Sequence, residues 1–139
     1  MLRHSLRLWH TQGMPEASVT PEDIDRLLAL VADVDALEGD YMTRRDPRWP
    51  EYREPVERLF IAFTHEPWGL PDYSPEAAAV LRDEPRGIET ATLDELRELL
   101  TAAARSERFY HGSWDALLRD GTIDRALRRL AQLRDQLQG

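Results

Sequence analysis

The 139-residue sequence predicts an all-α fold, an irregular orthogonal bundle of about five or six helices in a single domain. Three observations predict it. Leucine, isoleucine and valine recur at every third or fourth position over much of the chain, which is the spacing of one helix face. Residues that favour helix N-termini stand in front of several of these stretches. No segment shows the convincing apolar–polar alternation of a half-buried strand.

The first predicted helix has a clear start. Thr20 fits the N-cap and Pro21 the first helical position. An apolar stripe follows over residues 24–37 with helical spacing. Gly39 is expected to close the helix by adopting a positive φ.

The middle of the chain is divided by prolines. Residues 40–50 contain two prolines and are predicted to form a loop. A second helix is expected over residues 51–64, and its regular part can start at Pro55, because proline is tolerated only in the first turn. The short apolar run at 59–63 also permits a buried strand. Residues 65–73 are predicted to be irregular. Ser74 then fits the cap of a short third helix that ends near Asp83.

The last third of the chain predicts three more helices. Thr92 and Glu95 form a capping box in front of a leucine-rich stretch that ends near residues 108–110. Ser113 can cap a short helix, and Thr122 can cap the final one. The arginines of the final helix alternate with acids, which indicates a solvated face with ion pairs.

The composition excludes several classes of protein. The absence of cysteine excludes a disulfide scaffold, a thiolate metal site and a cysteine nucleophile. No apolar run approaches the roughly 20 residues that span a bilayer. The N-terminal residues lack the continuous apolar core of a signal peptide. We therefore expect a cytoplasmic protein with no membrane partner, in which residues 1–18 form a loosely held arm.

The net charge of −8 is unevenly distributed. Residues 93–139 hold 8 arginines and 8 acids, whereas residues 1–92 hold 10 arginines and 18 acids. An acidic surface repels nucleic-acid backbones, so a nucleic-acid partner is not expected. The same acids leave open a decoy that occupies a nucleic-acid-binding protein.

Residues 93–134 contain a Thr-x3-Arg-x2-Arg-Phe-x2-Gly element, a later glycine and a final helix with Arg-Leu-x2-Leu. These motifs comprise Thr101, Arg105, Arg108, Phe109, Gly112, Gly121, Arg129, Leu130 and Leu133. In these positions the segment resembles the bacterial domain-of-unknown-function family 6508. An aromatic stretch at Pro67–Tyr73 corresponds to another part of the family, and residues 74–81 depart from it. The resemblance implies an all-helical domain and attaches no activity to it.

An arginine-rich element is the first candidate ligand site. Arg105 and Arg108 are three residues apart, so we expect them to share a helix face. Two guanidiniums on one face can clamp a phosphate or carboxylate, and Tyr110 and His111 follow directly. The alternative is structural: arginines at a helix C-terminus stabilise its free carbonyls and pair with acids such as Glu107 or Asp115, and Phe109 fills the core.

Two loops that combine aromatic residues with proline form a candidate interaction surface. Trp49 and Tyr52 lie in the first loop, and Trp68 and Tyr73 in the second. Rigid aromatic side chains bind partners at a small cost in conformational entropy, so such loops are favoured at recognition surfaces. The alternative is that these rings cover the ends of the bundle.

No catalytic, metal or cofactor motif is recognised. The four histidines show no close pairing on one helix, and the serines lie outside any nucleophile motif. Our leading hypothesis is therefore a non-enzymatic module that binds another protein, or a second copy of itself, through the acidic first half and the aromatic loops. The alternative is a small-anion-binding protein or enzyme that uses Arg105 and Arg108.

Overall fold

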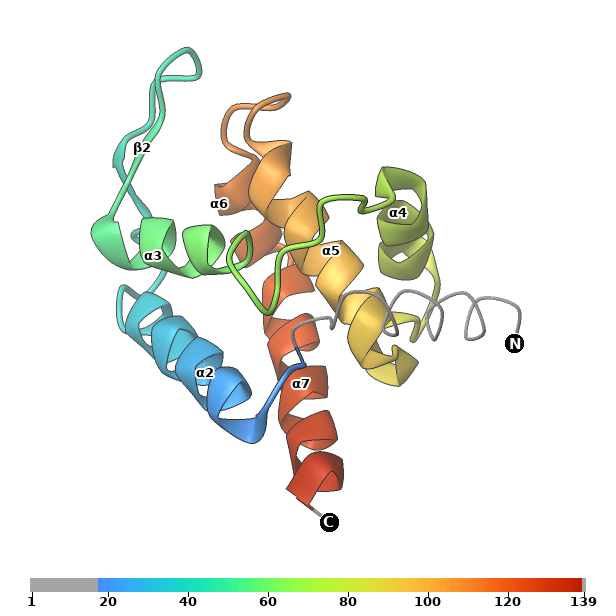
Figure 1. The fold of residues 1–139 in the computed structure, drawn as a ribbon. Coiled ribbons are helices and arrows are strands. Elements are labelled where there is room, and N and C mark those ends of the chain that lie inside the picture. The colour runs from blue at the N-terminus through green and yellow to red at the C-terminus, as the bar shows by residue number, and fades with distance from the viewer. Residues whose placement is uncertain (1–17, 139) are drawn as a thin grey trace.

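The structure, a computed structural model, describes residues 18–138 and consists mainly of helices (Figure 1). The predicted arm, residues 1–18, lies outside this range except for Ser18. The described elements are α2 (Pro21–Asp35), β1 (Met42–Arg44), β2 (Glu51–Tyr52), α3 (Glu54–Ala62), α4 (Pro75–Asp83), the 3-10 helix η1 (Ile88–Thr90), α5 (Leu93–Ser106), α6 (Ser113–Arg119) and α7 (Thr122–Gln138). The prediction of a helical bundle is confirmed.

Local capping explains where three helices begin. The Thr20 hydroxyl accepts a hydrogen bond from the Asp23 N–H, and the Asp23 carboxylate accepts one from the Thr20 N–H. Thr92 and Glu95 form the same reciprocal box at α5. Ser74 accepts from a backbone N–H in the first turn of α4. These starts match the predictions because capping depends on residues only two or three positions apart.

The prediction of a plain loop at residues 40–50 is wrong. Met42–Arg44 pairs with Glu51–Tyr52 as an antiparallel two-stranded hairpin with an irregular register. Met42 and Tyr52 are both buried, so packing against the helices holds these very short strands. The following helix consequently begins at Glu54 rather than Glu51, with Pro55 in its first turn.

Three helix ends differ from the predictions in detail. Gly39 adopts the expected positive φ of 87°, but α2 has already ended at Asp35. Gly112, with a φ of 92°, is the N-cap of α6 in place of Ser113. The last helix begins at Thr122, whose N–H donates to the carboxylate of Asp120 two residues before it.

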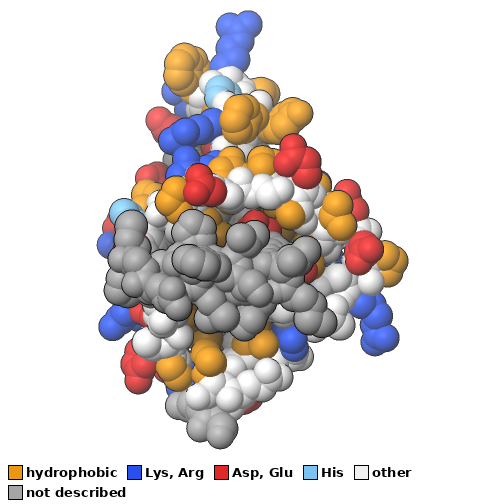
Figure 2. Space-filling model, turned by 45° about the vertical axis from the view of Figure 1, so that its right-hand side comes forward, with side chains coloured by type: hydrophobic (Ala, Val, Ile, Leu, Met, Phe, Trp, Pro, Cys, Tyr) orange, Lys and Arg blue, Asp and Glu red, His pale blue; other side chains and the backbone are white. Residues whose placement is uncertain are grey.

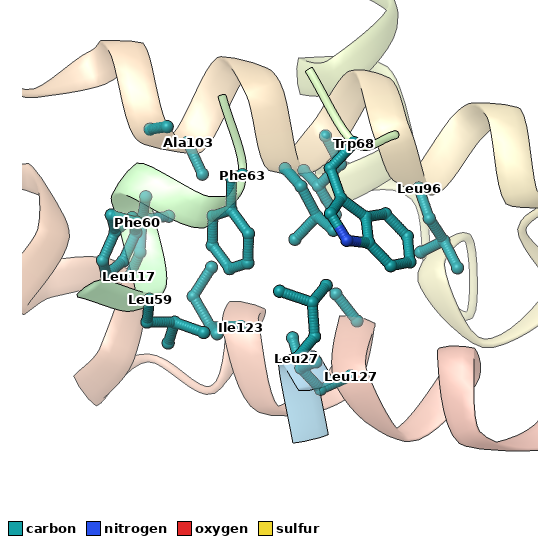
Figure 3. Packing of buried hydrophobic residues seen from close by; sticks show 14 of the residues in the cluster. Leu27, Leu59, Phe60, Phe63, Trp68, Leu96, Ala103, Leu117, Ile123 and Leu127 are labelled. Carbon is teal, nitrogen blue, oxygen red and sulfur yellow. The ribbon is translucent and has the colours of Figure 1, made fainter. Parts of the chain in front are cut away.

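One hydrophobic core joins the helices (Figure 3). Phe60 of α3 and Phe63, which follows the last residue of α3, are fully buried, and their rings meet edge to face at 5.3 Å. Figure 3 shows Leu27 of α2 beside Leu127 of α7, so the first and last described helices meet in this core.

Arginines of α7 tie its surface to neighbouring elements. Arg134 pairs with Asp25 of α2 at 2.5 Å, and Arg125 makes a two-pronged pair with Glu89 of η1. The Arg125 guanidinium lowers the pKa of Glu89 to about 2. The final helix therefore carries ion pairs as predicted, and two of them join separate elements. Within residues 18–138 no helix combines the length and apolar character needed to span a bilayer.

Candidate functional site

The hairpin and the α5–α6 turn lie at the same end of the molecule (Figure 1), and both carry exposed aromatic side chains. Trp49 is 68% exposed at the hairpin, and Phe109 and Tyr110 are 73% and 75% exposed in the turn. Figure 2 shows hydrophobic and arginine side chains and a histidine together at this end. We name this surface the aromatic end and define it by Arg48, Trp49, Arg108, Phe109, Tyr110 and His111.

A groove of about 700 Å³ separates the hairpin from the turn. Trp49 and Arg48 line it from the hairpin, and Arg108 and His111 line it from the turn. The Nδ1 atom of His111 lies 3.3 Å from the carbonyl oxygen of Pro47, which connects the two walls. The groove therefore presents an indole and two guanidiniums to solvent.

Glu107 organises the turn beneath this surface. Its carboxylate accepts hydrogen bonds from the N–H of Gly112 at 2.6 Å and the N–H of Trp114 at 3.0 Å. It also accepts one from the Tyr52 hydroxyl at 2.9 Å. A carboxylate at this position satisfies free N–H groups of α6 and opposes the positive end of the helix dipole. Glu107 thus caps α6 and fixes it to the base of the hairpin.

Trp114 connects the groove to the core. Its ring stacks on Phe60 at a centroid distance of 4.8 Å and meets Tyr52 at 5.1 Å. Its indole N–H donates to the carbonyl oxygen of Ala104 at 3.1 Å. Trp114 and Tyr52 both line the groove, so its floor is held by core packing rather than by loop residues alone.

The hydroxyl of Tyr52 is kept protonated by its surroundings. Burial raises the pKa of Tyr52 well above its ordinary value of 10, and donation to the Glu107 carboxylate raises it further. A proton held more tightly in the folded state than in the unfolded state makes folding less favourable once the unfolded chain begins to lose it.

Alkaline pH is therefore expected to destabilise the fold through Tyr52. Below pH 10 the hydroxyl is protonated in both states, and its contribution is complete. As the pH rises above 10, the unfolded state loses the proton first, so this residue lowers the free energy of unfolding by up to about 1.4 kcal/mol per pH unit. Urea unfolding of the wild type and Tyr52→Phe at a series of pH values measures the difference. Identical slopes in both proteins would contradict the assignment.

The four predicted ligand residues do not meet in one place. Helix α5 ends at Ser106, so Arg108 lies beyond it and does not share a helix face with Arg105. The Arg105 guanidinium lies over the Tyr73 ring, 5.6 Å from its centroid. Arg108 and His111 line the groove, whereas Tyr110 lines a different cavity. A shared anion site remains a prediction.

The two predicted aromatic loops differ in their surroundings. In the first loop Trp49 is exposed, whereas Tyr52 is only 7% exposed at the hairpin base. In the second, Trp68 is only 4% exposed and its carbonyl accepts a hydrogen bond from the buried Thr101 hydroxyl. Tyr73 is partly buried beneath Arg105. Of the two tryptophans among these four residues, only Trp49 has an exposed side chain.

Sequence reasoning missed two residues of this site. Phe109 was expected to fill the core under the structural interpretation, but it is exposed because it follows the end of α5 and no longer has the phase of its apolar stripe. Glu107 was considered only as an ion-pair partner. A signal for its capping role was available. Glu107 lies five positions before Gly112, and Gly112, the N-cap of α6, has no side chain with which to cap the helix.

Comparisons with known proteins identify a family without assigning an activity. The model described as "Family of unknown function (DUF6508)" matches residues 19–136, which extends well beyond the C-terminal resemblance in the sequence. No curated protein and no solved structure matches the chain. Within the described residues, no group of three or more histidine, aspartate or glutamate side chains is arranged to hold a metal ion.

Proposed function

This chain belongs to DUF6508, a family of unknown function, and we propose that it is a non-enzymatic domain that binds another protein through the aromatic end. The observation that carries the proposal is the grouping of Trp49, Phe109 and Tyr110, each at least two thirds exposed. Large aromatic residues contribute most of the binding energy at many protein interfaces. Leaving three of them in water at one end of a domain is expected where a partner covers them.

The elements that carry these rings support the proposal. Glu107 ties the turn to α6 and to Tyr52, and Trp114 ties the groove floor to Phe60. Side chains presented by a fixed scaffold lose less conformational entropy on binding than side chains on mobile loops. The aromatic end therefore has the properties of a preorganised binding surface.

The charged residues that line the groove indicate what kind of partner segment would complement it. Among the described residues, no carboxylate lies within ion-pair distance of Arg48 or Arg108. Glu51 and Glu57 line the same groove. A partner segment with an apolar residue for the groove and charged residues of both signs beside it would complement this surface. These features favour the aromatic end over the acidic first half as the proposed binding surface.

Loss of the exposed rings is expected to weaken partner binding. The double variant Trp49→Ala/Phe109→Ala should bind the partner at least tenfold more weakly, because each truncated hot-spot aromatic residue typically costs 2 kcal/mol or more. The partner is first identified by mass spectrometry after capture from the native host. Its dissociation constant is then measured by titration with the purified proteins.

A matched control uses exposed apolar residues outside the aromatic end. Ile61 and Val80 are also exposed, and Ile61→Ala/Val80→Ala removes a similar type of surface. This control should bind as the wild type does, and urea unfolding should show that every variant is folded under the binding conditions. The proposal fails if both double variants bind the identified partner equally well.

A further inference from the structure

A second cavity, of about 330 Å³, lies among α4, α5 and α6 on the other side of the α5–α6 turn. Its walls are mainly apolar, and Ala78, Ala79, Ala102 and Ala103 leave space where larger side chains would fill it. The exposed rings of Phe109 and Tyr110 stand at its open side. Small-molecule sites are typically clefts of about 300–1,000 Å³ lined mainly by apolar side chains, and this cavity has both properties.

Two serines supply a polar group in this apolar cavity. The Ser106 hydroxyl donates its hydrogen to the carbonyl oxygen of Ala103 at 2.7 Å, since a carbonyl can only accept. The oxygens of Ser106 and Ser113 are 2.5 Å apart, so the Ser113 hydroxyl must donate to Ser106. Both hydroxyl hydrogens are then used. Ser113 keeps oxygen lone pairs that can accept a hydrogen bond from a ligand.

The charged residue at this cavity gives little reason to expect an anion. Arg82 lines the cavity, but its side chain is exposed and lies 3.4 Å from the Asp83 carboxylate. A carboxylate ligand would find no free hydroxyl donor at Ser106 or Ser113. Burying its charge at these serines without a hydrogen-bond donor from them would be costly. An uncharged ligand with its own donor fits this arrangement better.

We propose that the cavity binds a small, uncharged aromatic molecule that carries a hydroxyl group. Its ring lies against the alanine-lined wall and the rings of Phe109 and Tyr110. Its hydroxyl donates to the Ser113 oxygen. This site is separate from the groove that contains Trp49, which does not line the cavity.

Three probes of similar shape test the proposal by calorimetry and by amide chemical shifts of the full chain. They are 2-naphthol, which donates a hydrogen bond, 2-methoxynaphthalene, which cannot, and 2-naphthoate, which is an anion. We expect 2-naphthol to bind roughly three- to tenfold more tightly than 2-methoxynaphthalene, the worth of one neutral hydrogen bond. Ser113→Ala should remove that difference and leave the affinity for 2-methoxynaphthalene unchanged.

Two further variants locate the site. Ala79→Leu fills the cavity and should abolish binding of both neutral probes, whereas Val80→Leu, on the exposed side of the same helix, should not. Trp49→Ala should leave 2-naphthol binding intact, which separates this site from the groove that contains Trp49. The proposal is overturned if no probe binds the wild type at millimolar concentration, or if the two neutral probes bind equally. It is also overturned if 2-naphthoate binds most tightly and loses its affinity in Arg82→Ala.

Discussion

Phe60→Ala is expected to lower the free energy of unfolding by about 3–5 kcal/mol, the largest single effect among these predictions. Phe60 is fully buried, stacks on Trp114 and meets Phe63 edge to face. Removing its ring loses the transfer free energy of the side chain and leaves a cavity beneath the floor of the groove. Urea unfolding followed by circular dichroism measures the change.

The neighbouring residue provides the control for that variant. Ile61 lies on the same helix but is exposed, so Ile61→Ala should change the free energy of unfolding by no more than about 0.5–1 kcal/mol. Equal losses at Phe60 and Ile61 would mean that α3 does not direct Phe60 into the core. Phe60→Ala should also change the near-ultraviolet circular dichroism signal of Trp114, since the two rings stack at 4.8 Å in the wild type.

Glu107→Ala is expected to have the second largest effect, a loss of about 2–4 kcal/mol. The variant leaves three donors without their acceptor: the N–H groups of Gly112 and Trp114 and the hydroxyl of Tyr52. Hydrogen bonds to a charged group contribute more than neutral ones, although partial access to water reduces the cost here. Urea unfolding gives the stability, and hydrogen exchange of the Gly112 and Trp114 amides shows whether the cap is lost.

Two comparison variants separate capping from general electrostatics. Glu107→Gln keeps one accepting oxygen and should lose less stability than Glu107→Ala. Glu57→Ala removes a carboxylate that lines the same groove from an exposed position and should cost less than about 0.5 kcal/mol. If Glu107→Ala and Glu57→Ala had the same free energy of unfolding, the hydrogen bonds of Glu107 would not stabilise the α5–α6 turn.

The helix starts were predictable because their causes are local. Thr20, Ser74 and Thr92 each accept a hydrogen bond from a backbone N–H three residues ahead. The sequence contains both partners within one turn, so the capping residues can be recognised without knowledge of the fold. The same reasoning placed the positive φ at Gly39.

The hairpin was not predictable because its causes are distant. Its strands contain three and two residues, too few for an alternating pattern to be visible. Tyr52 is held there by Glu107, which lies 55 residues further along the chain. A pair of prolines in this segment indicates a loop equally well, and only the tertiary contacts distinguish the two.

The exposure of the aromatic residues was equally beyond local inference. Trp49 and Trp68 both follow or precede prolines in short irregular segments, yet the first is exposed and the second buried. Trp68 belongs to the hydrophobic core, and Thr101 holds its segment there: the Thr101 hydroxyl donates to the carbonyl of Trp68 across 33 residues and accepts from the N–H of Leu70. The candidate site could be predicted as a set of aromatic and arginine residues, but not as a surface.

The meeting of α2 with α7 has a consequence for synthesis on the ribosome. Asp25 and its ion-pair partner Arg134 are separated by 109 positions in the sequence. Leu27 and Leu127, which lie side by side in the core (Figure 3), are separated by a similar length of chain. At a translation rate of 5–20 residues per second, the apolar side of the first helix lacks its final partner for roughly 5–20 s. Until the last helix emerges from the ribosome, the apolar side of α2 must therefore pack against α3 or be bound by a chaperone.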